Sequence, residues 1–201
     1  MNKSYKITKR FIDLTLSLIL IIILLPVIFV ISILVLIFNG RPIIFSQIRP
    51  GLNEKPFKLF KFRTMINQPD QENPELTDGE RITKLGNFLR NSSMDELPTL
   101  WNVFIGDMSF IGPRPLLMKY LSRYDQFQRR RHDVKPGISG WAQVNGRNLL
   151  SWDDKFELDI WYIENQSLIL DFRIFLKTIQ KVIVREGISS KDQATAEEFK
   201  G

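Results

Sequence analysis

The distribution of apolar residues divides the chain into two unequal parts. Between Asp13 and Arg41 there is no charged residue, and residues 14–38 are apolar except for Thr15, Ser17 and Ser32. About 20 apolar residues suffice to cross a bilayer core, whereas the apolar region of a cleaved signal peptide is about 7–15 residues long. We therefore predict a retained membrane element over residues 1–40.

Two topologies fit this element. Pro26 lies in the middle of the apolar run, where it removes one helical hydrogen bond and favours a kink. Basic residues flank the run on both sides, and basic flanks favour the cytoplasm. A helix broken at Pro26 could enter and leave by one face, whereas an ordinary kinked transmembrane helix would export one basic flank. The residue pattern alone leaves both open.

The remaining residues, 41–201, have the pattern of a folded domain. Two short apolar runs, 43–48 and 57–62, flank a turn at 49–54 and predict a β-hairpin. Apolar residues at helical spacing predict a mainly α-helical remainder. Helices are expected at 80–91, from Ser92-Ser93 onward, at 117–127, at 151–165 and at 171–186. The predicted fold is mainly α with a small β-hairpin, preceded by a Pro-broken membrane helix.

The last predicted helix is amphipathic. Its basic residues recur every four positions, at Arg173, Lys177, Lys181 and Arg185. Its apolar residues are Phe172, Phe175, Leu176, Ile179 and Ile183. A basic amphipathic helix can lie in the bilayer interface, and it can also pack on a core with its basic side in solvent.

Composition narrows the chemistry. The 28 Lys and Arg residues exceed the 22 Asp and Glu residues, which gives a net charge of +6 and favours an anionic partner. The chain has no cysteine and one histidine, His132, so thiol chemistry and multi-histidine metal sites are excluded.

The segment Ser93-Met94-Asp95-Glu96-Leu97-Pro98 allows two interpretations. Ser93 followed three residues later by Glu96 is the spacing of a helix capping box. A helix N-terminus also favours an ionised carboxylate, and an ionised aspartate can act as a nucleophile or a metal ligand.

Two further segments contain residues suited to phosphate binding. Pro113 and Pro115 bracket Arg114, and a guanidinium held in a stiff turn suits a phosphate group. The segment from Lys135 to Arg147 contains three glycines, which can let the backbone approach a ligand closely. It has neither the Walker A nor the dinucleotide-binding spacing.

Taken together, these motifs resemble a known family. Lys61-Phe62-Arg63-Thr64-Met65, Asp95-Glu96-Leu97-Pro98, the Gly106–Pro115 segment and the Lys135–Arg147 segment follow one N-terminal apolar run in that order. The chain resembles the bacterial sugar transferases, which are monotopic phosphoglycosyl transferases, in their minimal form. The likeness covers essentially the whole chain, including Gln193-Ala194-Thr195.

The resemblance implies a reaction and a location. Such enzymes transfer a sugar 1-phosphate from a UDP-sugar, an N-acetylated or deoxy-amino hexose by resemblance, to polyprenyl phosphate. They release UMP, form a covalent aspartyl intermediate and act on the cytoplasmic face of the bacterial inner membrane. The family also favours the re-entrant helix with its break at Pro26. In some relatives a serine precedes that proline, where this chain has Leu25.

The resemblance also implies roles for individual residues. It makes Asp95 the nucleophile and the ligand of a required Mg²⁺, and Glu96 the partner that orients or deprotonates the acceptor. Substrate phosphates and the nucleotide would be held by Lys61, Arg90, Arg114 and Arg147. Pro26, Pro113 and Pro115 would have structural roles.

Two other classes of protein fit part of the pattern. A membrane-anchored nucleic-acid-binding module would fit the charge, but no nucleic-acid motif is present and residues 70–80 are acidic, so we expect no nucleic acid. A non-catalytic scaffold for glycan assembly would fit if Asp95-Glu96 were only a helix cap. Contacts with membrane lipid are expected, and self-association or contacts with other glycan-assembly enzymes are left open.

Overall fold

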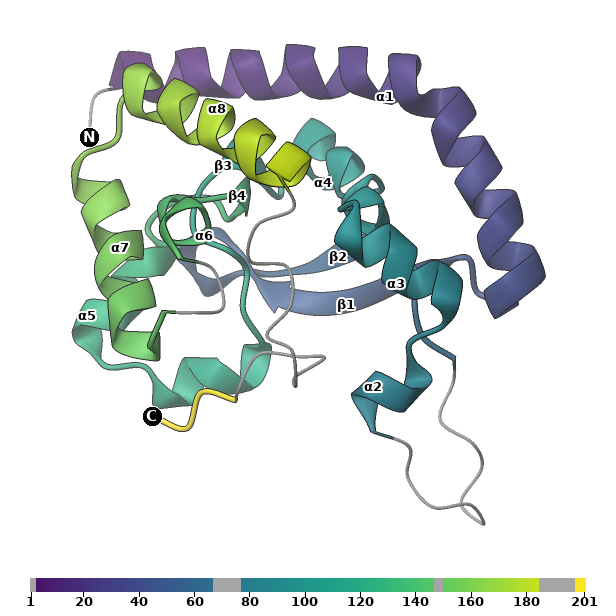
Figure 1. Ribbon diagram of the computed structural model, residues 1–201. Coiled ribbons are helices and arrows are strands. Elements are labelled where there is room, and N and C mark those ends of the chain that lie inside the picture. Colours follow the sequence, from purple (N-terminus) through teal and green to yellow (C-terminus); the bar gives the residue numbers. More distant parts are fainter. Residues whose placement is uncertain (1–2, 67–76, 147–149, 185–197) are drawn as a thin grey trace.

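The computed structural model describes residues 3–66, 77–146, 150–184 and 198–201. Its first element is a long helix, α1 (Lys3–Asn39), which bends part-way along and arches over the rest of the chain (Figure 1). Pro26 lies inside this helix, and its missing N–H leaves a carbonyl of the preceding turn without a helical partner. We attribute the bend to Pro26. By length and composition α1 could cross a membrane.

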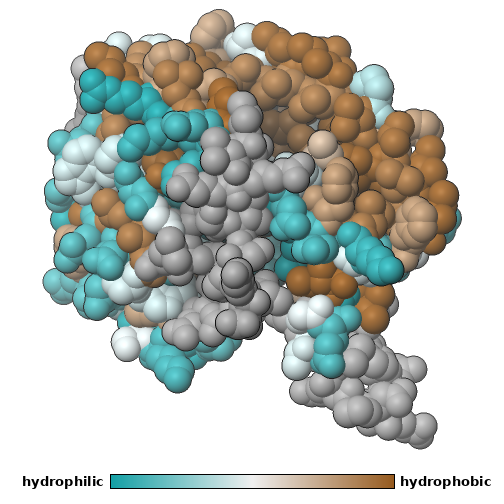
Figure 2. Space-filling view, viewed as in Figure 1, coloured by the Kyte–Doolittle hydropathy of each residue, from teal (hydrophilic) through white to brown (hydrophobic). Residues whose placement is uncertain are grey.

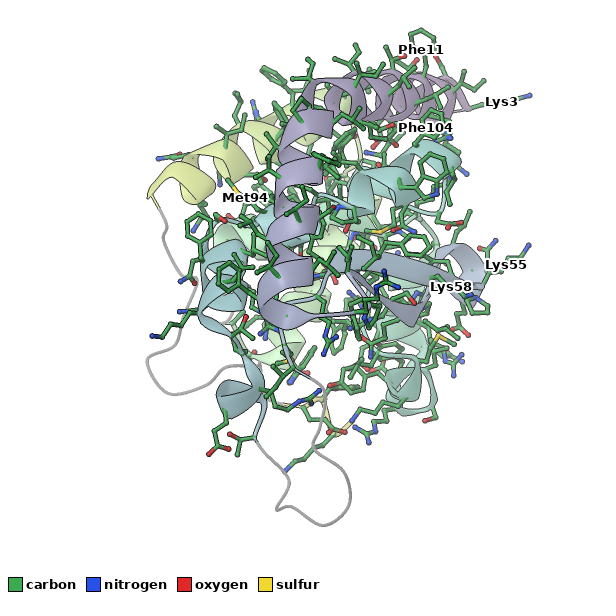
Figure 3. The ribbon with its side chains drawn as sticks, turned by 90° about the vertical axis from the view of Figure 1, so that its right-hand side faces the viewer. Lys3, Phe11, Lys55, Lys58, Met94 and Phe104 are labelled. Atoms are coloured by element: carbon green, nitrogen blue, oxygen red, sulfur yellow. The ribbon has the colours of Figure 1, made fainter. Side chains whose placement is uncertain are left out.

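The arm of α1 before the bend is bound to the rest of the chain through charged side chains, among them Arg10 and Asp13. Arg10 donates hydrogen bonds to the carbonyl oxygens of Val103 and Phe104, each at 2.7 Å. Asp13 accepts a hydrogen bond from the backbone N–H of Phe110 at 3.1 Å and is only 4% exposed. In Figure 3, Phe104 lies on the domain side of this arm, whereas Phe11 points away from the domain.

The arm after the bend returns to the same domain. Asn39 donates to the carbonyl oxygen of Arg63 at 2.7 Å and accepts from the hydroxyl of Thr83 at 2.8 Å. Ile31 and Val35, on the same arm, are buried in one apolar cluster with Phe62 and Leu89. Both arms of α1 therefore pack against one body of protein.

The predicted β-hairpin is confirmed. Strands β1 (Ile44–Pro50) and β2 (Pro56–Phe62) pair antiparallel around a 3-10 turn, η1 (Leu52–Glu54). Because side chains alternate between faces, Phe45, Gln47 and Arg49 share one face of the hairpin with Phe57, Leu59 and Lys61. Leu59 anchors that face in a buried cluster with Val103 and Met108.

The segment after the hairpin differs from its prediction. The expected helix at 80–91 is two helices, α2 (Asp78–Arg81) and α3 (Lys84–Asn91), because Ile82 is extended and forms a bridge with Met65. A single 3-10 turn, η2 (Met94–Glu96), then precedes helix α4 (Thr99–Ile105).

The predicted helix at 117–127 is wrong. The chain forms a 3-10 helix, η3 (Met118–Arg123), and a short helix, α5 (Gln126–Arg129), and Tyr124 between them is extended. Tyr120 and Tyr124 are instead buried with Phe156 and Phe199 in an aromatic cluster. Another 3-10 turn, η4 (Arg130–His132), follows α5 directly.

The glycine-rich segment forms a small parallel ladder that was not predicted. Strand β3 (Ser109–Ile111) pairs with β4 (Gly137–Ser139). A Cβ at Gly137 would lie 2.1 Å from the backbone nitrogen of Gly112, and a Cβ at Gly140 would lie 2.3 Å from the carbonyl oxygen of Gly112. These glycines allow two backbones to pack against each other. The hypothesis that they admit a ligand is therefore not supported by their surroundings.

In the described residues after β4, three helices follow: α6 (Trp141–Asn145), α7 (Trp152–Glu164) and α8 (Leu168–Val184). The last two confirm the predictions at 151–165 and 171–186. The side chains of Phe172, Leu176 and Ile179 on α8 are exposed, whereas Leu170 and Ile174 are buried. The predicted apolar stripe thus lies mainly on the surface, next to α1, where Figure 2 shows a continuous hydrophobic region. Ile183 and Arg185 lie outside the part described at side-chain level.

Candidate active site

The Asp95-Glu96 turn is not a helix cap. Ser93 has a backbone φ of +56° and its side chain makes no capping hydrogen bond, so the capping box is absent. The helix that follows, α4, begins three residues after Glu96, with Pro98 at its N-cap. A non-glycine residue at positive φ is uncommon and marks a specifically formed turn. The turn directs both carboxylates away from the helix end, toward neighbouring cations.

Glu96 is bound by two cations from distant parts of the chain. Its Oε1 lies 2.5 Å from Nζ of Lys61 on β2 and 2.8 Å from Nη2 of Arg114. Burial raises the pKa of Glu96, but the charges and hydrogen bonds of Arg114 and Lys61 outweigh burial and hold the pKa well below its usual range. Glu96 is therefore ionised at neutral pH and fixes both cations in place.

Asp95 has the opposite electrostatic environment. It is 8% exposed, and its Oδ2 lies 4.0 Å from Nζ of Lys61. Burial and the negative charge of Glu96 raise the pKa of Asp95, while Lys61, Arg114 and Arg90 oppose that rise. Two adjacent carboxylates whose pKa values shift in opposite directions are suited to different roles. Among the described residues Asp95 has an ion pair only with Lys61, at 4.0 Å, so it is the carboxylate available to a ligand.

The predicted arginines contribute unequally. Arg114 contacts Glu96 directly, and 45% of its side chain is exposed. Arg90 donates to the hydroxyl of Thr64 at 3.0 Å and acts on Asp95 through its charge. Arg147 lies outside the described residues, so its predicted role stays a prediction.

The strand that carries Lys61 is held by two side chains that the sequence did not indicate. Asn102 on α4 donates to the carbonyl oxygen of Lys58 at 2.6 Å and accepts from the N–H of Phe60 at 3.1 Å. Thr99 donates to the carbonyl oxygen of Phe60 at 2.9 Å. Both side chains hydrogen-bond to backbone groups on the edge of β2, and they fix Lys61 relative to the turn that precedes α4.

The turn that carries Arg114 has a buried support. Pro113 and Pro115 are both buried, as expected for residues that stiffen the turn. Arg131 on η4 donates to the carbonyl oxygen of Arg114 at 2.8 Å and pairs with Asp159 on α7 at 2.7 Å. The sequence shows Arg131 as part of a basic run, with no signal that Arg131 is buried while Arg129 is exposed.

The carboxylates fit one mode of Mg²⁺ binding. No group of three or more metal-ligating side chains occurs within the described ranges. Mg²⁺ is commonly held by one or two carboxylates together with substrate phosphates and water. Asp95 can supply such a carboxylate, since Glu96 is already paired with two cations.

Comparison with known proteins shows the family of this chain. The family model described as bacterial sugar transferase matches residues 4–185. The chain belongs to the bacterial sugar transferase family. It is 50% identical over 195 residues to the uncharacterized sugar transferase EpsL of Bacillus subtilis, covering 97% of this chain and 96% of that protein.

Two longer relatives have names that state an activity. The UDP-glucose:undecaprenyl-phosphate glucose-1-phosphate transferase of Escherichia coli is 37% identical over 191 residues, covering 90% of this chain and 41% of that protein. The UDP-N-acetylgalactosamine-undecaprenyl-phosphate N-acetylgalactosaminephosphotransferase of Aeromonas hydrophila is 37% identical over 191 residues, covering 91% and 45%. The chain thus spans less than half the length of these two relatives. Family membership confirms the resemblance and makes this sugar transferase an enzyme.

Proposed function

We propose that this enzyme transfers a sugar 1-phosphate from a UDP-sugar to polyprenyl phosphate, releasing UMP and forming a polyprenyl-diphospho-sugar. The observation that carries the proposal is the Asp95-Glu96 turn, with Lys61 and Arg114 bound to Glu96 and Asp95 left available. The names of the relatives, which act on UDP-sugars and undecaprenyl phosphate, support the same reaction. The scaffold alternative assumed that these acids only cap a helix, and they do not.

The proposed chemistry has two steps. A carboxylate oxygen of Asp95 attacks the sugar-bearing phosphorus, and the bond from this phosphorus to the bridging oxygen breaks, so that UMP leaves with the electron pair. An oxygen of polyprenyl phosphate then attacks the same phosphorus, and the bond to Asp95 breaks to restore the carboxylate. Bound Mg²⁺ would neutralise phosphate charge.

Glu96 has a positioning role in this proposal. Its low pKa makes it a weak base, so proton removal from the acceptor is not its main task. Its bonds to Lys61 and Arg114 hold both cations beside Asp95, where phosphate oxygens carry negative charge during transfer. Of the two roles predicted for Glu96, the geometry favours orientation.

We also propose that α1 is re-entrant and that the domain lies on the cytoplasmic face of the bacterial plasma membrane. The support is that Arg10 and Asp13 before the bend, and Asn39 after it, all contact the same domain. A straight transmembrane helix would place these residues on opposite sides of a hydrocarbon core about 30 Å thick. The exposed apolar residues of α8 lie next to α1 and can enter the same interface.

The activity is tested by incubating the purified enzyme with polyprenyl phosphate, Mg²⁺ and a panel of UDP-sugars. We expect UMP release from at least one donor, dependent on the lipid acceptor for sustained turnover. The panel should include UDP-glucose, UDP-galactose and N-acetylated or deoxy-amino hexoses. Release from none of them would contradict the proposed function.

The topology is tested by single cysteines, because the chain has none of its own. Ser4 and Ser46 are exposed and lie on either side of the apolar run. We expect Ser4→Cys and Ser46→Cys both to resist a membrane-impermeant thiol reagent in intact cells and both to react after lysis. Labelling of Ser4→Cys alone in intact cells would establish a spanning helix.

A further inference from the structure

Arg49 lies on the hairpin face that carries Lys61. Arg49 on β1 pairs with Phe57 on β2, and Phe45 on β1 pairs with Lys61 on β2. Both basic side chains therefore lie on the same face of the hairpin, and Phe57 and Lys61 are four residues apart along β2. That face packs against α4 through Leu59 and contacts the Asp95-Glu96 turn through Lys61. Arg49 was not among the residues expected to bind substrate.

Within the part of the chain that the structure describes, the guanidinium of Arg49 has no compensating negative charge. Its Nη2 donates to the side-chain oxygen of Gln47 at 2.6 Å, while its buried Nε has no hydrogen-bond partner. Within the described ranges, no carboxylate lies within 4.0 Å of it. The buried Arg131, in contrast, pairs with Asp159. Arg49 is half-buried, and its Nε is fully buried; a buried polar group without a partner is costly and needs an explanation.

Arg49 and Arg114 act on each other. Burial, together with the positive charge of Arg114, lowers the pKa of Arg49 to about 10. Pro50, the next residue of β1, lines a small cavity together with Pro113, Arg114 and Pro115. The end of β1 and the Arg114 turn therefore adjoin, and the positive charge of Arg114 acts on Arg49 even though Arg114 is paired with Glu96.

The position of Arg49 favours a soluble ligand over a lipid. Strand β1 starts beside the end of α1 and runs away from it, so its far end lies well below the N-terminal arm of α1 (Figure 1). Figure 3, turned by 90° about the vertical axis, also shows the end of the hairpin, marked by Lys55, below the N-terminal arm of α1. In Figure 2, which has the view of Figure 1, the hydrophobic surface of α1 and α8 lies along the top and the right.

We propose that Arg49 binds the phosphate that leaves with the nucleotide, so that Arg49 and Arg114 together hold the diphosphate of the sugar donor. This inference rests on the proposed function, in which UMP is the leaving group. Arg114 is already paired with Glu96, and the phosphates of the donor supply the negative charge that Arg49 lacks. A planar guanidinium donates two parallel hydrogen bonds to phosphate oxygens, and the free Nε of Arg49 is one such donor.

The test compares Arg49→Gln and Arg49→Lys with the parent enzyme, using Arg129→Gln as a matched control. Arg129 is an exposed arginine paired with Glu54 at the same end of the hairpin. We expect Arg49→Gln to weaken UMP binding in calorimetry by about ten- to a hundredfold, the loss typical of a hydrogen bond to a charged group. Arg49→Lys should recover part of that loss, and Arg129→Gln should bind UMP like the parent.

Steady-state kinetics then separates the sources of phosphate. We expect the KM for the UDP-sugar to rise in Arg49→Gln while the KM for polyprenyl phosphate is unchanged. A rise confined to polyprenyl phosphate would assign Arg49 to the lipid and overturn the inference. Parent-like UMP binding by folded Arg49→Gln, or by Arg49→Lys if Arg49→Gln does not fold, would also overturn it. Absence of turnover with every UDP-sugar would refute the proposed function instead, because UMP binding is measured without turnover.

Discussion

Replacement of Asp95 by asparagine should abolish UMP release while leaving the fold intact. An amide has nearly the shape of the carboxylate but cannot form the covalent acyl-phosphate bond. Burial and the charge of Glu96 already disfavour the ionised form of Asp95, so removal of its charge should not lower stability greatly. We expect a melting temperature close to that of the parent and no detectable turnover.

Mass spectrometry of the intact protein tests the same step directly. With UDP-sugar and no acceptor, the parent should gain the mass of one sugar phosphate, and Asp95→Asn should not. Asp133→Asn is a suitable control, because Asp133 is exposed and lies outside the site. Normal turnover by Asp95→Asn would refute the aspartyl mechanism, and this conclusion does not depend on the other proposals.

Replacement of Asp159 by asparagine should cause the largest loss of stability among single substitutions of charged residues. Asp159 and Arg131 are 4% and 3% exposed, and they are joined by two hydrogen bonds, at 2.7 and 3.3 Å. Removal of one partner leaves a buried charge unpaired, which typically costs about 3–5 kcal/mol. Because Arg131 also supports the carbonyl oxygen of Arg114, turnover should fall as well.

A neighbouring ion pair provides the control. Arg130 and Glu164 also join η4 to α7, at 2.7 Å, but both side chains are more than 40% exposed. Glu164→Gln should therefore cost less than about 1 kcal/mol, as is typical of surface pairs. Urea unfolding in detergent measures both variants. Equal losses for the two variants would show that burial of the Arg131–Asp159 pair adds nothing to stability.

The parts of the fold that were predictable are those with a regular pattern over several residues. The hairpin was found because two apolar runs flank a turn containing Pro50 and Gly51. The β3–β4 ladder was missed because strands of three residues have no measurable periodicity, and their pairing joins segments far apart in the chain. Tyr120 and Tyr124 have helical spacing, but their rings are used in a tertiary cluster that overrides it.

The residues of the site that belong to sequence motifs were predictable. Asp95, Glu96, Lys61 and Arg114 were all predicted, and the structure brings the four together. Their supports were not predictable, because Thr99 and Asn102 bind the backbone of a strand about 40 residues away. A contact between a side chain and a distant backbone leaves no spacing in the sequence. The same applies to Arg131, whose burial depends on Asp159.

The contacts of Arg10 and Asp13 have a consequence for how the molecule can be divided. Arg10 occupies the carbonyl oxygens at the end of α4, and Asp13 occupies the N–H of Phe110, next to the segment that leads to Arg114. Removal of α1 would leave these backbone groups without partners and would expose Phe62 and Leu89. The helix α1 is thus a structural part of the catalytic unit. In a hybrid of two enzymes, α1 and the domain should therefore come from the same parent, with the junction before Lys3.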